Sequence, residues 1–386
     1  AISRRYRERE NHISSDSWPI YISLQKDGIL FKMRRTQDLP DKESATMFFQ
    51  DCKLSHQAQI TGISHSVKEI LPPDLLDLTQ LQKEANIRYG YTASEVYDIA
   101  QSLYEKKLIS YPRTSSRYLT EDVFDSLPPI MARLLSWELF PAAKGTGGID
   151  ISNLSRHVIS AEKANVHHAI IITGIRPGNL SEKEMQVYRL VAGRMLETFM
   201  APCRIETTNV EAVCAAQHFK AEQTRIIEAG WHDVFMRSDM VPKSGYSVNE
   251  LPEVEKGDNL NVCGCNMVHK KELPVDPFTD AELVEYMELN GLGTVSSRTN
   301  IIRTLVNRKY IRYSGKYIVP TPKGMFTYET IRGKKIADTS LTADWEKQLT
   351  GLESGMITGQ DFLNRIRTLA KEMTDDIFNT YSTKEE

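Results

Sequence analysis

The chain has 386 residues, of which 40% are hydrophobic and 26% charged, and its formal net charge at pH 7 is −3. A polypeptide of this size and composition is expected to form two to four domains, each with its own core, which excludes collagen-like and disordered classes. No apolar run approaches the ~18 residues that a membrane-spanning helix needs, and the first residues show no leader pattern, so no membrane association is predicted. The five cysteines are an odd number spread thinly along the chain, which favours the reducing cytoplasm over a disulfide framework.

A charged helical run opens the chain, over residues 1–12. Because the sequence begins with Ala1 inside this run, we expect that it has been cut from a longer protein. Short alternating strands are predicted within residues 16–70 and again within 205–270, because apolar and polar side chains alternate there with a period of two.

A helical block is predicted between these two β segments, over residues 78–200. Its apolar side chains recur at helical spacing, and three hydroxyl residues stand where N-caps are expected, with Glu or Gln three residues later: Thr79, Thr92 and Ser181. A third region begins after Pro277 and is predicted to be helical to the end of the chain.

The sequence contains a quasi-repeat at an offset of 202 residues. In each copy a helix, a glycine-containing turn, a second helix and a short strand follow one another, and the matching residues include Thr92 and Thr294, Lys107 and Lys309, Ile109 and Ile311, and Tyr111 and Tyr313. The second copy continues as a hairpin over residues 310–319, with its turn at Ser314-Gly315. Helix-turn-helix plus hairpin is a winged-helix pattern, which often binds nucleic acid but also serves as a protein contact.

Basic side chains are concentrated on the second copy. Residues 291–336 contain one acidic residue, Glu329, and ten basic ones, for a local charge of +9: Arg298, Arg303, Arg308, Lys309, Arg312, Lys316, Lys323, Arg332, Lys334 and Lys335. Such a stripe in a nearly neutral chain indicates a polyanionic partner. The alternative is a solvated face that acidic residues from elsewhere in the fold neutralise.

The familiar catalytic motifs are missing from the sequence. There is no Walker A loop, no HExxH, no GxSxG and no GxGxxG after a strand, and no DxD pair indicates a magnesium site. The spacing of Cys263-Gly-Cys265 is too short for a zinc knuckle. No metal ligand is therefore predicted within this chain.

The residues best suited to catalysis follow the first short strand. Tyr111 stands there, held by Pro112, with Arg113 and Arg117 after it. A tyrosine that attacks phosphorus needs charge compensation, and a forked guanidinium can contact both the phosphate and the forming phenolate. The alternative for Tyr111 alone is an ordinary core or rim tyrosine. Tyr313 has no such cluster beside it and is predicted to be a wing residue.

The segment Ile109-Ser-Tyr-Pro-Arg-Thr114 resembles the active-site region of type IA DNA topoisomerases, most of all that of bacterial topoisomerase III. The resemblance extends over nearly the whole chain, in four further segments: Val166-His-His-Ala-Ile-Ile-Ile-Thr173, Phe278-Thr-Asp-Ala-Glu-Leu283, Gly291-Leu-Gly-Thr294 and Leu341-Thr-Ala-Asp-Trp-Glu346.

The resemblance implies that Tyr111 attacks a phosphodiester of single-stranded DNA, leaving a 5′-phosphotyrosyl link and a free 3′ hydroxyl, so that rejoining needs no ATP. Arg113 would stabilise the scissile phosphate and His167 would assist by hydrogen bonding. The remaining residues expected to bind DNA are Thr114, Arg117, Arg298 and Arg303.

The resemblance also implies a multidomain α+β clamp. Its expected parts are an N-terminal helix of the base (1–12), a β arch in two pieces (13–77 and 201–277), an inserted helical, winged-helix-like domain carrying Tyr111 (78–200), and a second helical, winged-helix-like base domain (278–386).

The chain departs from the family pattern in four places. Ser115 stands where the family usually has Asp, and Ile172 and Val295 each replace a proline. The Toprim domain, with its catalytic Glu and its magnesium site, is expected to be missing, so that Mg would be bound only by that domain of the parent. We therefore expect a monomeric fragment that binds single-stranded DNA but does not complete relaxation.

Two other functions remain open at this stage. One is a non-catalytic winged-helix DNA-binding accessory protein. The other is a tyrosine recombinase, which shares the nucleophile but needs several Arg and His residues ahead of it, whereas here only Arg88 lies nearby upstream.

Overall fold

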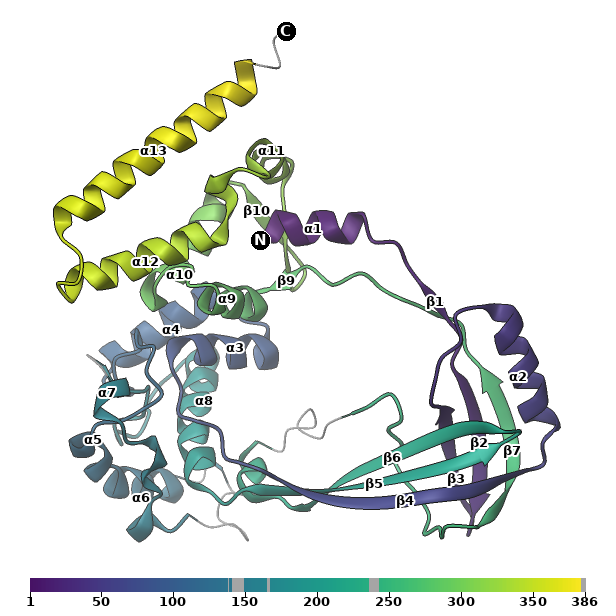
Figure 1. Ribbon diagram of the computed structural model, residues 1–386. Coiled ribbons are helices and arrows are strands. Elements are labelled where there is room, and N and C mark those ends of the chain that lie inside the picture. The colour runs from purple at the N-terminus through teal and green to yellow at the C-terminus, as the bar shows by residue number, and fades with distance from the viewer. Residues whose placement is uncertain (138, 141–148, 165–166, 236–242, 383–386) are drawn as a thin grey trace.

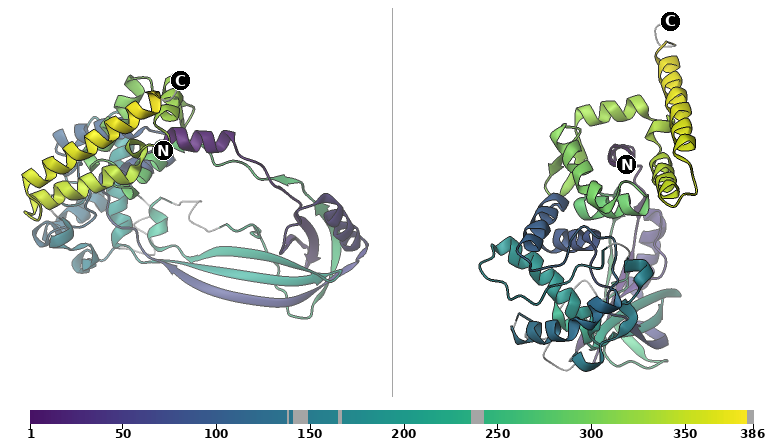
Figure 2. Two further views of the ribbon diagram at one scale, coloured as in Figure 1. Left: turned by 45° about the horizontal axis from the view of Figure 1, so that its top comes forward. Right: turned by 90° about the vertical axis from the view of Figure 1, so that its left-hand side faces the viewer.

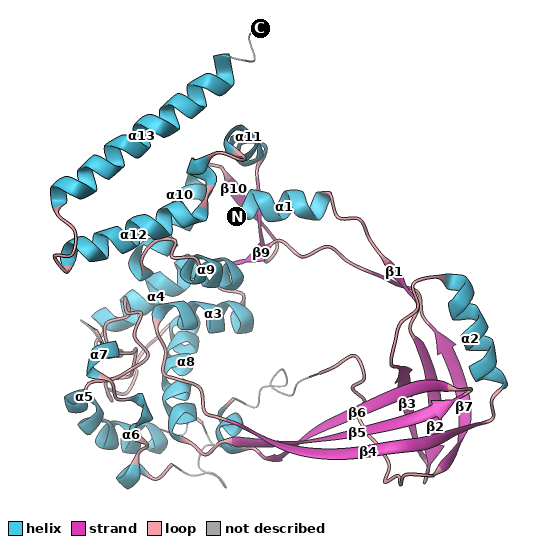
Figure 3. Ribbon diagram, in the orientation of Figure 1, coloured by secondary structure: helices cyan, strands magenta, loops and turns pink. Residues whose placement is uncertain are grey.

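The computed structural model describes residues 1–386 except 138, 141–148, 165–166, 236–242 and 383–386. It is a mixed helix-and-sheet protein whose ribbon traces a ring (Figure 1). A β barrel forms one side of the ring and two helical regions form the other, as the colouring by secondary structure in Figure 3 shows.

The barrel joins the two predicted β segments. It is closed in the order β2-β3-β6-β5-β4-β7, with strands β2 (Ile20–Lys26), β3 (Ile29–Arg35), β4 (Gln57–Ile70), β5 (Cys203–Cys214), β6 (Gln217–Glu228) and β7 (Asn259–Met267). All neighbouring pairs are antiparallel. Alternate side chains of each strand fill the barrel core, which is the period that the sequence showed.

One helix was missed inside the first β segment. α2 (Lys42–Leu54) lies between β3 and β4, where the sequence had indicated only strands. The Asp41 side chain accepts a hydrogen bond from the Ser44 N–H and so caps the helix, while Ala45 and Cys52 are buried against the barrel. Tertiary burial of this one face explains why the helix forms despite weak periodicity.

The helical block between the β segments contains α3 (Leu78–Tyr89), α4 (Ala93–Glu105), α5 (Glu121–Asp125), α6 (Leu127–Ser136), α7 (Ala161–Ala164) and α8 (Glu182–Phe199). The capping boxes at Thr92 and Ser181 are present as predicted. The predicted cap at Thr79 is wrong: Asp77 caps α3 by accepting from the Gln80 N–H at 2.7 Å, and Thr79 instead donates to Glu288.

The C-terminal region is helical around a small sheet, ordered β10-β11-β9. Its elements are β9 (Phe278–Thr279), α9 (Asp280–Leu289), α10 (Val295–Asn307), β10 (Ile311–Ser314), β11 (Tyr317–Pro320), α11 (Pro322–Ile331), α12 (Thr339–Glu353) and α13 (Gly359–Ser382). The predicted hairpin is present as β10 and β11. Figure 1 and the right-hand view of Figure 2 show α13 projecting away from the remaining elements.

The N-terminal helix α1 (Ile2–Glu10) packs on this C-terminal region, far from it in sequence. The Arg5 guanidinium lies 3.3 Å from the centre of the Phe278 ring, and Arg7 Nη2 is 2.6 Å from Glu329 Oε1. From α1 the chain crosses to the barrel through β1 (Asp16–Ser17), which pairs with β8 (Lys270–Lys271) on the returning segment. The first and last parts of the chain therefore meet and complete the ring (Figure 1).

The backbone repeats at the offset seen in the sequence. Lys107 and Lys309, each just after the second helix of its copy, both have a left-handed φ, of 60° and 59°. Their carbonyls accept hydrogen bonds from Thr173 and Thr321 respectively, each at 2.6 Å. The partners differ in origin, because Thr321 follows the hairpin directly whereas Thr173 comes from a distant segment.

Candidate nucleophile site

The segment that carries Tyr111 is held against residues 167–173. The Ser110 N–H donates to the Ile171 carbonyl at 2.8 Å, and Ile109 and Ile172 form an isolated antiparallel bridge. The Ala169 N–H donates to the Tyr118 carbonyl at 2.9 Å. These bonds bring together two motifs that lie more than fifty residues apart in the chain.

Tyr111 and His167, both predicted site residues, meet at this junction. Their ring centroids are 4.5 Å apart, and the half-buried Tyr111 ring also meets the edge of Tyr104 at 5.4 Å. His167 is exposed to solvent. Val166, which begins the histidine motif, lies outside the described residues.

Thr114 holds the segment that carries His167 in place. Its side chain is 4% exposed, and its hydroxyl donates to the His167 carbonyl at 3.0 Å and accepts from the Ser116 N–H at 3.0 Å. The geometry gives Thr114 a role in holding the two motifs together. A direct contact of Thr114 with DNA stays a prediction.

Arg113 reaches back over α4. Its Nη2 donates to Gln101 Oε1 at 3.2 Å, and its guanidinium lies 5.1 Å from the centre of the Tyr97 ring. Its Nε is buried and has no hydrogen-bond partner among the described residues. A buried donor left unpaired is costly, so the hydrogen bond to Gln101 satisfies this guanidinium only in part.

Three residues of this site were missed by the sequence analysis: Tyr97, Gln101 and Tyr104. They lie on α4 at positions i, i+4 and i+7, and therefore on one face of the helix that precedes Tyr111. That spacing was visible in the sequence, but polar and aromatic side chains on a partly buried face do not distinguish a site from ordinary packing.

The structure places the two predicted DNA-binding arginines of α10 in contacts between helices. Arg298 is 8% exposed, and its Nη1 donates to the Thr79 hydroxyl at 3.2 Å and lies 3.5 Å from Glu288. The Arg303 guanidinium donates a hydrogen bond to the Ser94 hydroxyl, and its Nη2 lies 2.8 Å from Asp98 Oδ2. Both arginines therefore join α10 to neighbouring helices in this structure, and their contact with DNA stays a prediction.

Arg117 contacts the start of α3, where the Leu78 N–H also donates to the Thr114 carbonyl. Its Nε donates to Asp77 Oδ2 at 2.7 Å, and a third of its side chain remains exposed. Since Asp77 is buried and also caps α3, this pair joins the nucleophile segment to the start of that helix.

The basic stripe divides into paired and unpaired cations. Besides Arg298 and Arg303, Arg332 lies 3.7 Å from Glu329 and Lys335 lies 3.3 Å from Glu372. The cations that are exposed and make no ion pair with a described residue lie around α10, the hairpin and the start of α11: Arg308, Lys309, Arg312, Lys316 and Lys323. Neutralisation by other acids thus accounts for part of the stripe only.

Tyr313 does not have the surroundings of Tyr111. Its hydroxyl donates to Asp280 Oδ1 at 3.1 Å, and burial, with the nearby Asp280 carboxylate, raises its pKa. Asp280 is itself buried and also accepts from the Ala93 N–H at 3.2 Å. Tyr313 is therefore engaged in holding β10, α9 and α4 together.

The described residues do not fit a magnesium site. Among them, no group of three or more His, Cys, Asp or Glu side chains could hold a metal ion. We therefore derive no step through a metal.

The part of the chain that the structure describes also contains no helix long and apolar enough to cross a membrane.

Comparison with known proteins places this geometry in a family. A family model described as DNA topoisomerase matches residues 1–364. The chain is 31% identical to DNA topoisomerase 3 of Bacillus licheniformis over 344 residues, covering 83% of this chain and 47% of that protein, and 30% identical to DNA topoisomerase 3 of Bacillus subtilis over 355 residues, covering 85% and 48%.

A solved structure supports the same assignment at the level of the fold. The full-length topoisomerase I from Thermotoga maritima superposes with a TM-score of 0.74 at 22% identity, covering 96% of this chain and 61% of that one. The chain spans about half the length of the curated relatives it matches. It belongs to the type IA DNA topoisomerase family and is similar in sequence to bacterial DNA topoisomerases 3.

Proposed function

We propose that this chain supplies the strand-cleaving tyrosine of a type IA DNA topoisomerase. The Tyr111 hydroxyl attacks a phosphodiester of single-stranded DNA: a bond forms between its oxygen and phosphorus, and the bond from phosphorus to the 3′ oxygen breaks. The phenol loses its proton and the released 3′ oxygen gains one. Because the phosphotyrosyl ester keeps the energy of the broken bond, the reverse attack by the 3′ hydroxyl rejoins the strand without ATP.

Arg113 is proposed to bind the scissile phosphate. The observation that carries the proposal is the 4.5 Å contact between the Tyr111 and His167 rings. On α4, Gln101 holds the Arg113 guanidinium one turn before Tyr104, whose ring meets Tyr111. A guanidinium fixed before the reaction stabilises charge on the phosphate without reorganising during the reaction. His167 is exposed beside Tyr111, where it could donate a hydrogen bond to the same phosphate.

The DNA-binding surface is proposed to include the winged-helix-like part of the C-terminal region. α9, α10 and the β10–β11 hairpin follow the order of such a module, and the five unpaired cations named above lie on it. Single-stranded DNA bound there would lose affinity as salt rises, because released counterions drive the binding. We propose that Arg117 and Thr114 contact the same bound DNA strand near Tyr111.

We retain the five-part division of the chain at residues 12, 77, 200 and 277, and propose a cytoplasmic monomer. Mg and a general acid are proposed to come from the Toprim domain that the family resemblance implies. On this basis the 386-residue chain alone binds single-stranded DNA without completing relaxation.

Covalent trapping on the native gene product that contains this sequence tests the proposal. A 3′-end-labelled single-stranded oligonucleotide is incubated with the protein and resolved on a denaturing gel. We expect label on the wild-type protein and none on Tyr111→Phe, while Tyr313→Phe, the matched tyrosine of the second repeat, keeps the label. Label on Tyr111→Phe would refute the assignment of the nucleophile, and intact DNA binding without label on any variant would favour the accessory-protein function.

A further inference from the structure

One side of the barrel is closed over a very short distance. β3 and β6 pair only at Arg34 with Lys220 and at Arg35 with Phe219, whereas β2 and β3 pair at every residue from Ile29 to Arg34 of β3. Beyond Arg34, towards the start of β3, the two strands have no further paired residues within the described chain.

A loop segment takes the place that β3 would have had beside β6. The Glu222 N–H donates to the Tyr246 carbonyl at 2.9 Å, and the Val248 N–H donates to the Glu222 carbonyl at 2.8 Å. In the register of the β3–β6 pair, Glu222 is the residue that would face Lys32. Because the loop uses these two groups of Glu222, none is left for β3.

The outer edge of β3 is therefore unpaired at two residues. The Thr36 N–H donates to His218 of β6, so in the alternation of an antiparallel pair the main-chain groups of Lys32 and Leu30 point to the same side, away from β2. Neither residue makes a main-chain hydrogen bond to the loop segment among the described residues. An open strand edge is a template on which another extended chain can pair.

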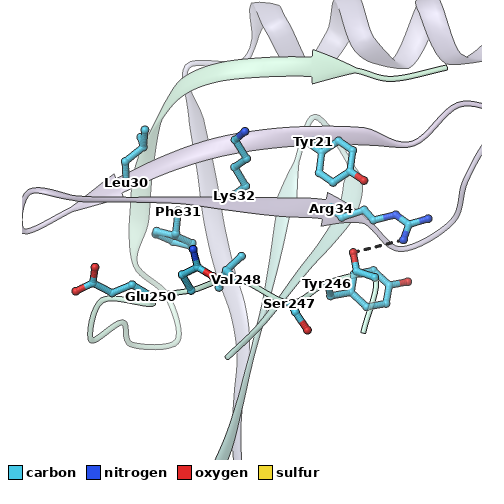
Figure 4. A pocket seen from close by; sticks show the side chains of 11 residues that line it. Tyr21, Leu30, Phe31, Lys32, Arg34, Tyr246, Ser247, Val248 and Glu250 are labelled. Carbon is cyan, nitrogen blue, oxygen red and sulfur yellow. Dashed lines mark hydrogen bonds between the residues drawn. The ribbon is translucent and has the colours of Figure 1, made fainter. Parts of the chain in front are cut away.

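A slot of about 430 Å³ separates this edge from the loop segment. Figure 4 shows β3 along one side of it, with Leu30, Lys32 and Arg34, and the loop along the other, with Tyr246 and Val248. At one end Leu30 is 60% exposed. At the other end Arg34 bonds Asp38 at 2.6 Å and the Gly245 carbonyl at 3.4 Å.

We propose that this slot binds an extended acidic peptide segment of a partner protein by adding a strand to β3. Its main chain pairs with Leu30 and Lys32, one apolar side chain covers the exposed Leu30, and a carboxylate faces Lys32, which is exposed and makes no ion pair with a described residue. Glu250 lines the slot near Phe31, so the carboxylate belongs at the Arg34 end. This is peptide recognition by strand addition, and it does not depend on the chemistry at Tyr111.

The charges of the slot favour a peptide over a nucleic acid. Arg34 is neutralised by Asp38, which leaves Lys32 as a lining cation without an ion pair to a described residue, and Glu250 lines the slot from the loop side. A surface for single-stranded DNA needs a net positive groove, which the slot lacks. The main-chain groups at Leu30 and Lys32 instead match the spacing of an extended polypeptide.

The test uses the full 386-residue chain and two capped, fluorescein-labelled hexapeptides of serine that carry one valine and, two residues later, either aspartate or lysine, so that the two varied side chains share one face of the added strand as Leu30 and Lys32 share one face of β3. Binding is measured by fluorescence polarisation, and amide hydrogen exchange is measured with and without saturating peptide. Leu30→Pro removes the outward N–H but none of the β2–β3 hydrogen bonds, and Leu30→Val keeps the N–H. Lys32→Glu tests the charge, with Lys68→Glu on the exposed part of β4 as its control.

We expect the aspartate peptide to bind at least about tenfold more tightly than the lysine peptide and to slow exchange at Leu30 and Lys32. Leu30→Pro should weaken binding about tenfold or more and Lys32→Glu about threefold, whereas Leu30→Val and Lys68→Glu bind as the wild type does. The proposal is overturned if the peptide does not bind at 1 mM, if Leu30→Pro binds it equally with an unchanged melting temperature, or if an oligothymidylate protects the two amides instead.

Discussion

Loss of the Gln101 side chain should slow strand cleavage through its effect on Arg113. In the structure, Arg113 Nη2 donates to Gln101 Oε1 at 3.2 Å, and the guanidinium lies over the Tyr97 ring. A hydrogen bond to a charged group contributes about 1.5–3 kcal/mol, and the length of this one places it at the lower end. Since about 1.4 kcal/mol corresponds to a factor of ten in rate, we expect Gln101→Met to cleave about tenfold more slowly.

Methionine is the appropriate substitution because it has the length of glutamine but cannot accept a strong hydrogen bond. The assay is single-turnover formation of the covalent complex by the native gene product at saturating oligonucleotide, with the Kd measured separately. The rate should fall while the Kd changes little, because Gln101 is proposed to orient Arg113 for the reaction and not to bind DNA itself.

A double-mutant cycle separates positioning from a general loss of stability. If Gln101 acts through Arg113, then Gln101→Met should cost little when Arg113 is already replaced by lysine. The reasoning would be refuted if the rate losses of the two single variants simply added in the double variant. It would also be refuted if Gln101→Met cleaved at the wild-type rate, or if it weakened DNA binding without slowing cleavage.

Three other predictions concern the frame of the site and the DNA-binding surface. Thr114→Val removes the bond to the His167 carbonyl and should lower the unfolding free energy by about 1–2 kcal/mol, measured by urea denaturation; an unchanged midpoint would contradict the role given to Thr114. Hydrogen bonds from Lys106, then from Ser102 of α4 and from Ser181, lower the pKa of Glu184 to about 2, so its stabilisation is present above about pH 4.5 and lost as pH falls towards 2. The melting temperature of Glu184→Gln should therefore lie below that of the wild type at pH 7 and approach it below pH 4; a constant difference would argue against the charge. Arg312→Glu should weaken binding of oligothymidylate and reduce the salt slope of log K by about one, with Arg312→Lys as the control that keeps both.

Local sequence patterns determined those features whose partners lie within a few residues. The capping boxes at Thr92 and Ser181 are found where the pattern placed them, and the hairpin turn falls at Gly315-Lys316, one residue later than predicted. The same holds for the quasi-repeat, because the left-handed residue after each second helix follows from a local turn. The motif around Tyr111 was also sufficient to indicate the family, since its residues are contiguous.

Tertiary structure decided everything that depends on partners far apart in the chain. A cap at Thr79 was plausible locally, but Asp77 took that place and Thr79 bonded a helix two hundred residues away. Arg298 counted as a free cation in the sequence, yet it is buried beside Glu288. The reason is that a charge or hydroxyl is satisfied by whichever polar group the fold brings near it, and local spacing carries no information about that group.

The same reason explains the junction of Tyr111 with His167 and the open edge of β3. Both depend on which distant segment pairs with the free edge of an extended segment. Residues 169–172 pair beside Ile109, and Tyr246–Val248 pair with Glu222 in the place that β3 would have taken. The alternation of side chains along a strand fixes which face is buried. Which edge is paired, and which is left open, is set only when the whole chain has folded, because main-chain donors and acceptors are the same at every residue.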